Sequence, residues 1–331
     1  METTYRREVS DRVSSLAYST VSRCCLATTL GSGAFMFDLN RDIHETEQVV
    51  TYAPSIFDFD PLVSSCFLGM KHQYIAVGSY NGGVSVLSKQ SKENKAFYST
   101  GYTCAVHSLQ PVPHNETNVL VCTKYGAEVV DMDTNQSVVA LEDPAPRAIG
   151  AVSLSPTAFA VANYDGSVLL YDSRTGSEAV TVLSVPDQLM SLAVCEDTRE
   201  VCVGTVAGRV FTLRCVHSEL REQAFATGKV RSPVTAACIR AGKIVVGDLA
   251  GRVSIIDTTP KGAATRYWTA ESLLVSHESV ALRERSPQQP HAARPAVDAE
   301  VTALSLAEDS VWVSFSTNHP EMTSHVIPLP V

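Results

Sequence analysis

Histidine and cysteine are the residues of this chain best suited to metal ligation or nucleophilic catalysis, and their spacing favours neither. The nine histidines, at positions 44, 72, 107, 114, 217, 277, 291, 319 and 325, form no HExxH pair. The chain has no GxSxG nucleophile elbow and no phosphate-binding P-loop. His107 lies in a predicted strand, so we interpret it as a core or channel histidine. We therefore expect no catalytic residues, no metal site and no cofactor.

The nine cysteines are scattered, and most stand inside apolar runs such as Val201-Cys202-Val203. No CxxC pair occurs, and the adjacent Cys24 and Cys25 point to opposite faces of a strand. An odd number of dispersed cysteines favours reduced, core-filling thiols in an intracellular protein over disulfides or metal ligation.

Two arginines, Arg209 and Arg252, occupy equivalent places in the near-identical segments 204–213 (GTVAGRVFTL) and 247–256 (GDLAGRVSII). One interpretation is that both are solvated hairpin residues. The other is that two adjacent repeats present a matched pair of guanidiniums to an acidic partner, because the arginine fork suits carboxylates.

The segment that carries these arginines belongs to a ten-residue phrase that recurs along the chain. Looser copies occupy 78–87 (GSYNGGVSVL) and 162–171 (ANYDGSVLLY), so the starts at 78, 162, 204 and 247 are 84, 42 and 43 residues apart. Each copy has a strand end, a tight turn with Gly at its fifth place and a β-rich run. A fixed period near 42 residues is typical of propeller blades.

Alternation and turn chemistry predict seven four-stranded units. First strands are predicted at 13–16, 63–67, 105–109, 151–154, 190–194, 234–238 and 301–305. Fourth strands are predicted near 47–52, 95–99, 137–141, 179–183, 222–226 and 265–269. The seventh unit has no fourth strand of its own, and residues 3–9 are expected to supply it, which would remove the open sheet edges.

Between the sixth and seventh units, residues 270–299 depart from the β pattern. They contain the three arginines Arg283, Arg285 and Arg294 and are rich in proline, with Ser286-Pro-Gln-Gln-Pro at their centre. The segment is either a tolerated insertion or a docking arm in which Ser286 is a candidate phosphorylation site, whose added charge would alter arginine pairing.

Composition restricts the function further. Of the 331 residues, 45% are hydrophobic and 18% charged, as in a folded globular protein, and the formal net charge is -9. An acidic chain disfavours direct nucleic-acid binding. No secretory leader and no run long enough to span a membrane is recognised, so a soluble cytoplasmic or nuclear protein is expected.

These features resemble the WD40-repeat β-propellers over nearly the whole chain. The Trp-Asp pair that ends the third strand in that family corresponds here to Phe37-Asp38, Val130-Asp131, Tyr171-Asp172 and Ile256-Asp257. The Gly-His dipeptide that opens standard repeats is absent, so the buried hydrogen-bond network of regular members is not expected. The resemblance implies one all-β domain over residues 1–331, a seven-bladed propeller closed by the N-terminal strand pairing with the last blade.

The resemblance also implies a binding rim, because in this family the loops that enter the first strands often hold peptides. Here those loops contain Arg12, Leu62, Tyr102, Arg147, Gln188, Arg231 and Glu300. Arginine and tyrosine are enriched at interface anchors.

We therefore expect a non-catalytic protein-interaction scaffold, a subunit of an intracellular complex that binds other proteins or peptides and neither nucleic acid nor membrane. The alternative is an enzyme or small-ligand binder that uses the mouth of the central channel.

Overall fold

The computed structural model describes residues 7–9, 11–31, 33–38, 46–50, 60–142, 147–195, 197–216, 219–223, 230, 232–240, 242–257, 266–269, 299–307, 310–317 and 324–330. Over these residues the protein is all-β and contains 28 strands. No helix in this part of the chain is long and apolar enough to cross a membrane. Arg231, Ser286 and most of the segment 270–299 lie outside the described residues.

The strands form seven antiparallel sheets of four strands each. Sheet 1 contains β2 (Val13–Ser19), β3 (Cys24–Thr29), β4 (Ala34–Asp38) and β5 (Thr46–Val50). Sheet 2 contains β6 (Leu62–Leu68), β7 (Tyr74–Ser79), β8 (Gly83–Ser88) and β9 (Asn94–Ser99). Sheet 3 contains β10 (Val106–Pro111), β11 (Asn118–Thr123), β12 (Gly126–Asp131) and β13 (Gln136–Leu141).

Sheet 4 contains β14 (Ala148–Ser153), β15 (Ala158–Asn163), β16 (Ser167–Asp172) and β17 (Thr181–Ser184). Sheet 5 contains β18 (Leu189–Cys195), β19 (Glu200–Thr205), β20 (Val210–Val216) and β21 (Glu219–Gln223). Sheet 6 contains β22 (Val234–Arg240), β23 (Lys243–Asp248), β24 (Arg252–Asp257) and β25 (Arg266–Thr269). Sheet 7 joins β26 (Ala299–Leu306), β27 (Ser310–Thr317) and β28 (Ser324–Pro330) to β1 (Arg7–Val9).

Sheet 7 is the one sheet in this part of the chain that is built from both ends of the sequence. The other six follow chain order, whereas sheet 7 has the order β1-β28-β27-β26. Arg7 stands opposite Val326 and Val9 opposite Ser324 in an antiparallel ladder. The pairing of the N-terminal segment with the last sheet is therefore confirmed, with a described strand of residues 7–9 within the predicted 3–9.

The predicted first strands are all confirmed, and the fourth strands agree less well. The fourth strand of sheet 5, predicted at 222–226, is β21 at Glu219–Gln223, and that of sheet 4 is displaced from 179–183 to Thr181–Ser184. Strand β17 shows the cause, since none of its four residues is fully buried and little of it packs in a core. A strand with little buried surface lacks the alternation that marks strand ends.

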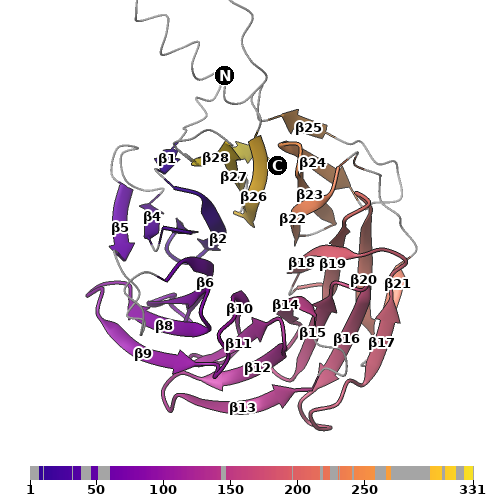
Figure 1. The fold of residues 1–331 in the computed structure, drawn as a ribbon, viewed down its shortest axis with the longest axis horizontal. Coiled ribbons are helices and arrows are strands. Elements are labelled where there is room, and N and C mark those ends of the chain that lie inside the picture. The colour runs from indigo at the N-terminus through magenta and orange to yellow at the C-terminus, as the bar shows by residue number, and fades with distance from the viewer. Residues whose placement is uncertain are drawn as a thin grey trace, which may run out of the picture.

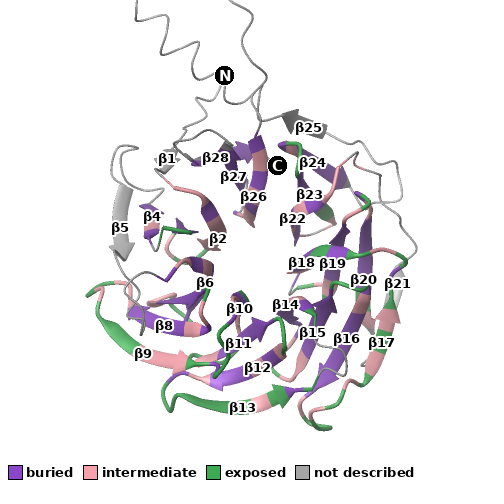
Figure 2. Ribbon diagram, viewed as in Figure 1, coloured by how far each residue is buried: buried purple, intermediate pink, exposed green. Residues whose placement is uncertain are grey.

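Neighbouring sheets pack face to face through hydrophobic clusters. One cluster joins each consecutive pair from sheets 1 and 2 to sheets 6 and 7. A further cluster joins sheet 7 back to sheet 1 through Trp312 and Val326 on one side and Phe37 on the other. Burying apolar surface between sheets is the main stabilising term here. Figure 2 shows the result: the inner strands are mostly buried, and exposed residues collect on β9, β13 and β17.

The first strands lie innermost, around a common centre (Figure 1). They contact one another in the order β2, β6, β10, β14, β18, β22 and β26, and β26 contacts β2. Hydroxyl groups connect several of these neighbours by donating to a carbonyl of the next first strand. These bonds are Ser14 to Leu62 (2.6 Å), Ser64 to Val106 (2.7 Å), Ser108 to Ala151 (3.2 Å) and Thr235 to Val301 (2.5 Å).

Two glycines of the repeated phrase have separate roles. Gly at the fifth place has a positive φ in all four copies, at Gly82, Gly166, Gly208 and Gly251. Gly at the first place lets the next sheet approach: a methyl carbon added at Gly247 would lie 2.2 Å from Cγ1 of Val301 on β26. The phrase therefore meets two structural requirements: its fifth place allows a left-handed turn, and its first place allows close packing between sheets.

The cysteines fill the core, as predicted. All nine are reduced thiols, and all but Cys215 are buried. Burial raises the pKa of the Cys66 and Cys238 thiols and raises that of Cys202 to about 12. These three thiols stay protonated near neutral pH and are poor nucleophiles.

Candidate functional site

One edge of the molecule, named here the turn rim, is where each second strand ends and each first strand begins. A backbone hydrogen bond recurs along it. The donor lies in the turn between the second and third strands of a sheet, and the acceptor lies just before the first strand of the same sheet. The bonds run from Leu30 to Arg12, Tyr80 to Pro61, Tyr164 to Arg147, Val206 to Gln188 and Leu249 to Pro233, at 2.8–3.0 Å. The entry loops chosen from the sequence and the hairpin tips therefore form one surface.

Large side chains are exposed along the turn rim. The third place of the phrase is a hairpin tip, where the side chain leaves the packed sheet, and it holds Tyr80, Tyr164 and Leu249, with Leu30 at the corresponding tip of sheet 1. Tyr125, at the shorter turn of sheet 3, and Tyr102, in the loop before β10, are exposed by 45% and 51%. Tyr80, Tyr102, Tyr125 and Tyr164 are named here the tyrosine patch, and they belong to three neighbouring sheets, 2 to 4.

Tyr102 and Tyr125 are the closest members of the patch. Their ring centroids are 4.7 Å apart with the planes tilted by 36°, and the Lys124 ammonium lies 4.8 Å from the centre of the Tyr125 ring. Both geometries are attractive for aromatic quadrupoles. The Tyr164 hydroxyl donates to the Gln188 side chain at 3.1 Å, which orients a third tyrosine of the patch.

A pocket of about 300 Å³ opens beside the Tyr102–Tyr125 pair. Its apolar lining includes Val121, Ala127 and Leu141, and its polar lining includes Glu128 and Glu142. Burial and then the charge and hydrogen bond of Glu128 raise the pKa of Tyr98, so the Tyr98 phenol stays protonated and donates to the carboxylate. The pocket thus combines aromatic edges, an apolar lining and negative charge.

The other residues predicted for the rim are in varied environments. Arg12 forms an ion pair with Glu300, so these two side chains from sheets 1 and 7 satisfy each other. Arg147 is exposed and forms no ion pair with any residue that the structure describes. Leu62 does not belong to the surface: it is fully buried between sheets 1 and 2, because it is the first residue of β6 and faces that core.

The arginines of the two near-identical phrases are not equivalent. Arg209 forms a two-point pair with Asp187, through Nη2 to Oδ1 and Nε to Oδ2, both at 2.6 Å. Asp187 lies in the entry loop of the same sheet. At Arg252 the backbone amide donates to Asp248, and no carboxylate among the described residues clamps the guanidinium as Asp187 clamps that of Arg209. The equivalence in sequence therefore reflects a shared turn, and Arg209 already has a carboxylate partner.

The first strands enclose two cavities of about 250 and 510 Å³. The smaller is lined by residues of all seven first strands, including His107. The larger includes His72, Cys66 and Cys238. Desolvation, with Lys124 second, lowers the pKa of His107. Within the described ranges, no three His, Cys, Asp or Glu side chains gather as a metal ion requires.

His72 should make stability depend on pH. Its Nδ1 lies 2.7 Å from the Ser19 hydroxyl, and its ring stacks on Phe67 at 5.7 Å. Burial first and Lys89 second lower its pKa below the ordinary 6.5. The unfolded chain then takes up the proton more readily than the folded protein. The contribution of His72 to the free energy of unfolding is therefore fully present above about pH 6.5 and is lost as the pH falls through the lowered pKa.

We expect the urea midpoint to fall between pH 7.5 and 5.5, with a shallower fall in His72→Asn. Asparagine is chosen because residue 72 has a φ of 49°, which asparagine tolerates. An equal pH dependence in the two proteins would contradict this role of His72.

Neither protein-family models nor curated proteins provide a match to this chain, so its function has to be argued from the geometry described above.

Proposed function

We propose that the seven sheets form a seven-bladed β-propeller of the WD40 type, closed by the pairing of β1 with β28. Three observations support this architecture. The sheets pack in cyclic order, with sheet 7 on sheet 1; every first strand lines one central cavity; and the turn glycine recurs with positive φ. In addition, Asp38, Asp131, Asp172 and Asp257 each end a third strand, as the Trp-Asp pair does in that family.

The function we propose is a non-catalytic protein-interaction platform, a subunit of an intracellular complex. The observation that carries this proposal is the tyrosine patch, four exposed tyrosines on three neighbouring sheets. Tyrosine is enriched at interface anchors because its ring buries much area at a small cost in conformational entropy. Rigid sheets hold the loops that carry it, so little ordering is needed on binding.

The pocket beside Tyr102 and Tyr125 suits a basic side chain of the partner. The apolar lining can cover an aliphatic stem, while the tyrosine rings and the carboxylates of Glu128 and Glu142 attract a cationic head. The net charge of -9 favours the approach of a basic partner in the same way.

The test replaces Tyr80, Tyr102 and Tyr125 together by alanine and compares the proteins recovered with the tagged chain by affinity purification and quantitative mass spectrometry. We expect recovery of the bound partner to fall about tenfold or more, as for interface hot spots. The double variant Glu128→Gln and Glu142→Gln should give a smaller loss.

The matched control is Val138→Ala with Val182→Ala, because these two exposed apolar side chains lie on the fourth strands β13 and β17 instead. The control should recover the partner as the parent protein does. Undiminished recovery by the tyrosine variant, with an unchanged melting temperature, would reject the patch as the docking surface.

The alternative function, an enzyme or small-ligand binder, would use the central cavities. Their described lining offers Cys66 and Cys238, whose pKa values are raised by burial, and two histidines, whose pKa values are lowered. His72 is already engaged by Ser19. These groups are neutral at pH 7 and are a weak basis for nucleophilic or ionic chemistry, so the platform is the better-supported proposal.

A further inference from the structure

A second surface lies at the edge opposite the turn rim, between sheets 4 and 5. A groove of about 710 Å³ is bounded there by four segments, the β14–β15 turn, the end of β16, the β18–β19 turn and the end of β20. Its lining includes three arginines, Arg174, Arg199 and Arg214, and three hydroxyl residues, Ser155, Thr157 and Thr198. Named here the arginine groove, it shares no residue with the tyrosine patch.

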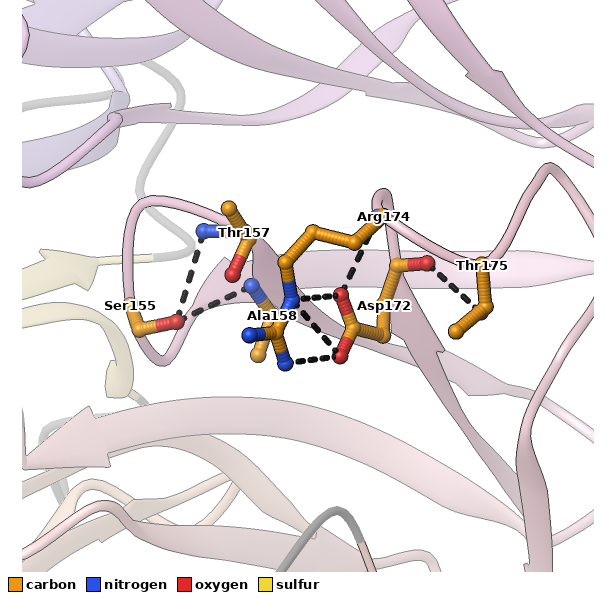
Figure 3. Close-up of polar contacts among 6 residues, drawn as sticks. All are labelled: Ser155, Thr157, Ala158, Asp172, Arg174 and Thr175. Carbon is orange, nitrogen blue, oxygen red and sulfur yellow. Dashed lines mark hydrogen bonds and ion pairs between the residues drawn. The ribbon is translucent and has the colours of Figure 1, made fainter.

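Arg174 is held in place by Asp172, the last residue of β16. The Arg174 Nε donates to Oδ1 at 2.9 Å and Nη2 to Oδ2 at 2.5 Å, and the Arg174 backbone amide also donates to Oδ1 at 3.1 Å. Figure 3 shows the guanidinium against the Asp172 carboxylate, and Ala158 and the turn that Ser155 caps belong to the same groove. The carboxylate is 5% exposed and the arginine side chain 69% exposed, so a buried anion orients an exposed cation.

The hydrogen bonds from Arg174 lower the pKa of Asp172, so the carboxylate stays ionised. The Nη1 nitrogen of Arg174 is bonded to no residue in the described ranges and keeps its donors for another acceptor.

Arg199 and Arg214 provide further positive charge. Both are exposed, and neither forms an ion pair with a residue that the structure describes. Glu200, which faces Arg214 in the β19–β20 ladder, accepts a hydrogen bond from the Thr198 hydroxyl at 2.9 Å.

The local charge contrasts with that of the whole chain. Three guanidiniums and the carboxylates of Asp172 and Asp197 line the groove, which leaves one net positive charge in a protein of net charge -9. A single excess charge matches a carboxylate better than a phosphoryl group of charge about -2. Arginine forks bind carboxylates at two points.

We propose that the arginine groove binds an acidic segment of a partner protein, with a Glu or Asp side chain between Arg174, Arg199 and Arg214. The hydroxyls of Ser155 and Thr157 lie at the same wall and can donate to the second oxygen or to the peptide backbone of the segment. Because the two surfaces lie at opposite edges, the proposed platform can hold this segment and the partner of the turn rim at the same time.

The experiment measures fluorescence anisotropy of a labelled hexaglutamate peptide with the full chain at near-physiological salt. We expect saturable binding that weakens about tenfold or more in the double variant Arg199→Glu and Arg214→Glu, because reversing a charge converts attraction into repulsion. The matched control is Arg147→Glu, an exposed arginine at the turn rim, which should bind as the parent does. Both substituted positions in the groove are exposed, so the melting temperature should not change.

Three outcomes would overturn the proposal. They are equal binding by the groove variant and the parent, an equal loss in the Arg147→Glu control, and no binding by the parent protein. A phosphoserine peptide of matched length that binds more than about tenfold tighter than hexaglutamate would overturn the choice of carboxylate. We expect the tyrosine variants to leave this assay unchanged, because the two surfaces share no residue, so failure here and failure of the turn rim are distinguishable.

Discussion

Removal of residues 1–9 lowers the melting temperature by roughly 5–10 °C, whereas removal of residues 1–6 leaves it nearly unchanged: this is the result we expect. The difference between the two deletions is β1, whose three residues pair with β28. Loss of the strand removes backbone hydrogen bonds worth about 3 kcal/mol together, and a protein of this size shifts by a few degrees per kcal/mol. It also leaves the edge of β28 open to pairing with other chains.

Differential scanning calorimetry of the parent and both deletions checks this prediction, with light scattering to detect association. If the 1–9 deletion melts with the parent, β1 is dispensable and the proposed closure of the propeller fails. If both deletions melt equally early, the stabilising contacts lie within residues 1–6.

A single methyl group at Gly166 should destabilise the protein by about 2 kcal/mol or more. Gly166 has a φ of +101°, and a carbon added there would lie 2.4 Å from the carbonyl oxygen of Val185 and 2.7 Å from that of Asp187. The Gly166 carbonyl also accepts a hydrogen bond from the Val185 amide, so the crossing chain cannot retreat without breaking it. Backbone strain and steric overlap therefore act together.

Two other glycines separate these causes. Gly176 has a φ of +132° but nothing within 4 Å of an added carbon, and Gly150 is in the sheet with its nearest contact at 3.7 Å. We expect urea unfolding to rank Gly166→Ala as the most damaging, Gly176→Ala as intermediate and Gly150→Ala as nearly neutral. Equal midpoints for the three variants would show that the turn adjusts freely and would contradict this account.

These glycines also show how far the sequence predicts the fold. A fifth-place glycine every 42 residues or so indicates the turn, and through it the register of second and third strands, because few other residues adopt that conformation. The crossing of Val185 over Gly166 is a contact between loops, and local sequence does not encode it. The fourth strand β17 was displaced for a related reason, since it pairs with one neighbouring strand and none of its residues is fully buried.

The candidate site was partly predictable. Tyr102 was predicted as a residue of the binding rim from its place before a first strand. Its ring contact with Tyr125 was not predictable, because the two tyrosines lie in separate loops. Tyr80 and Tyr164 were missed, although their place at the third position of the phrase, a hairpin tip, is a signal in the sequence that could have indicated their exposure. The Arg209–Asp187 pair was missed because equivalence of two arginines in sequence gives no information about their partners. The arginine groove combines four separate segments, which only the packing of sheets 4 and 5 brings together.

The antiparallel pairing of β1 with β28 has a mechanical consequence. Arg7 lies beside Val326, and the ladder runs from there inward to Val9 beside Ser324. Residue 7 and residue 330 lie at the same end of this ladder. A force that pulls them apart therefore breaks the hydrogen bonds between β1 and β28 one after another instead of all together. The backbone pairing that we expect to resist heat should therefore yield at low force, and a tether attached at these two points would open sheet 7 before any other.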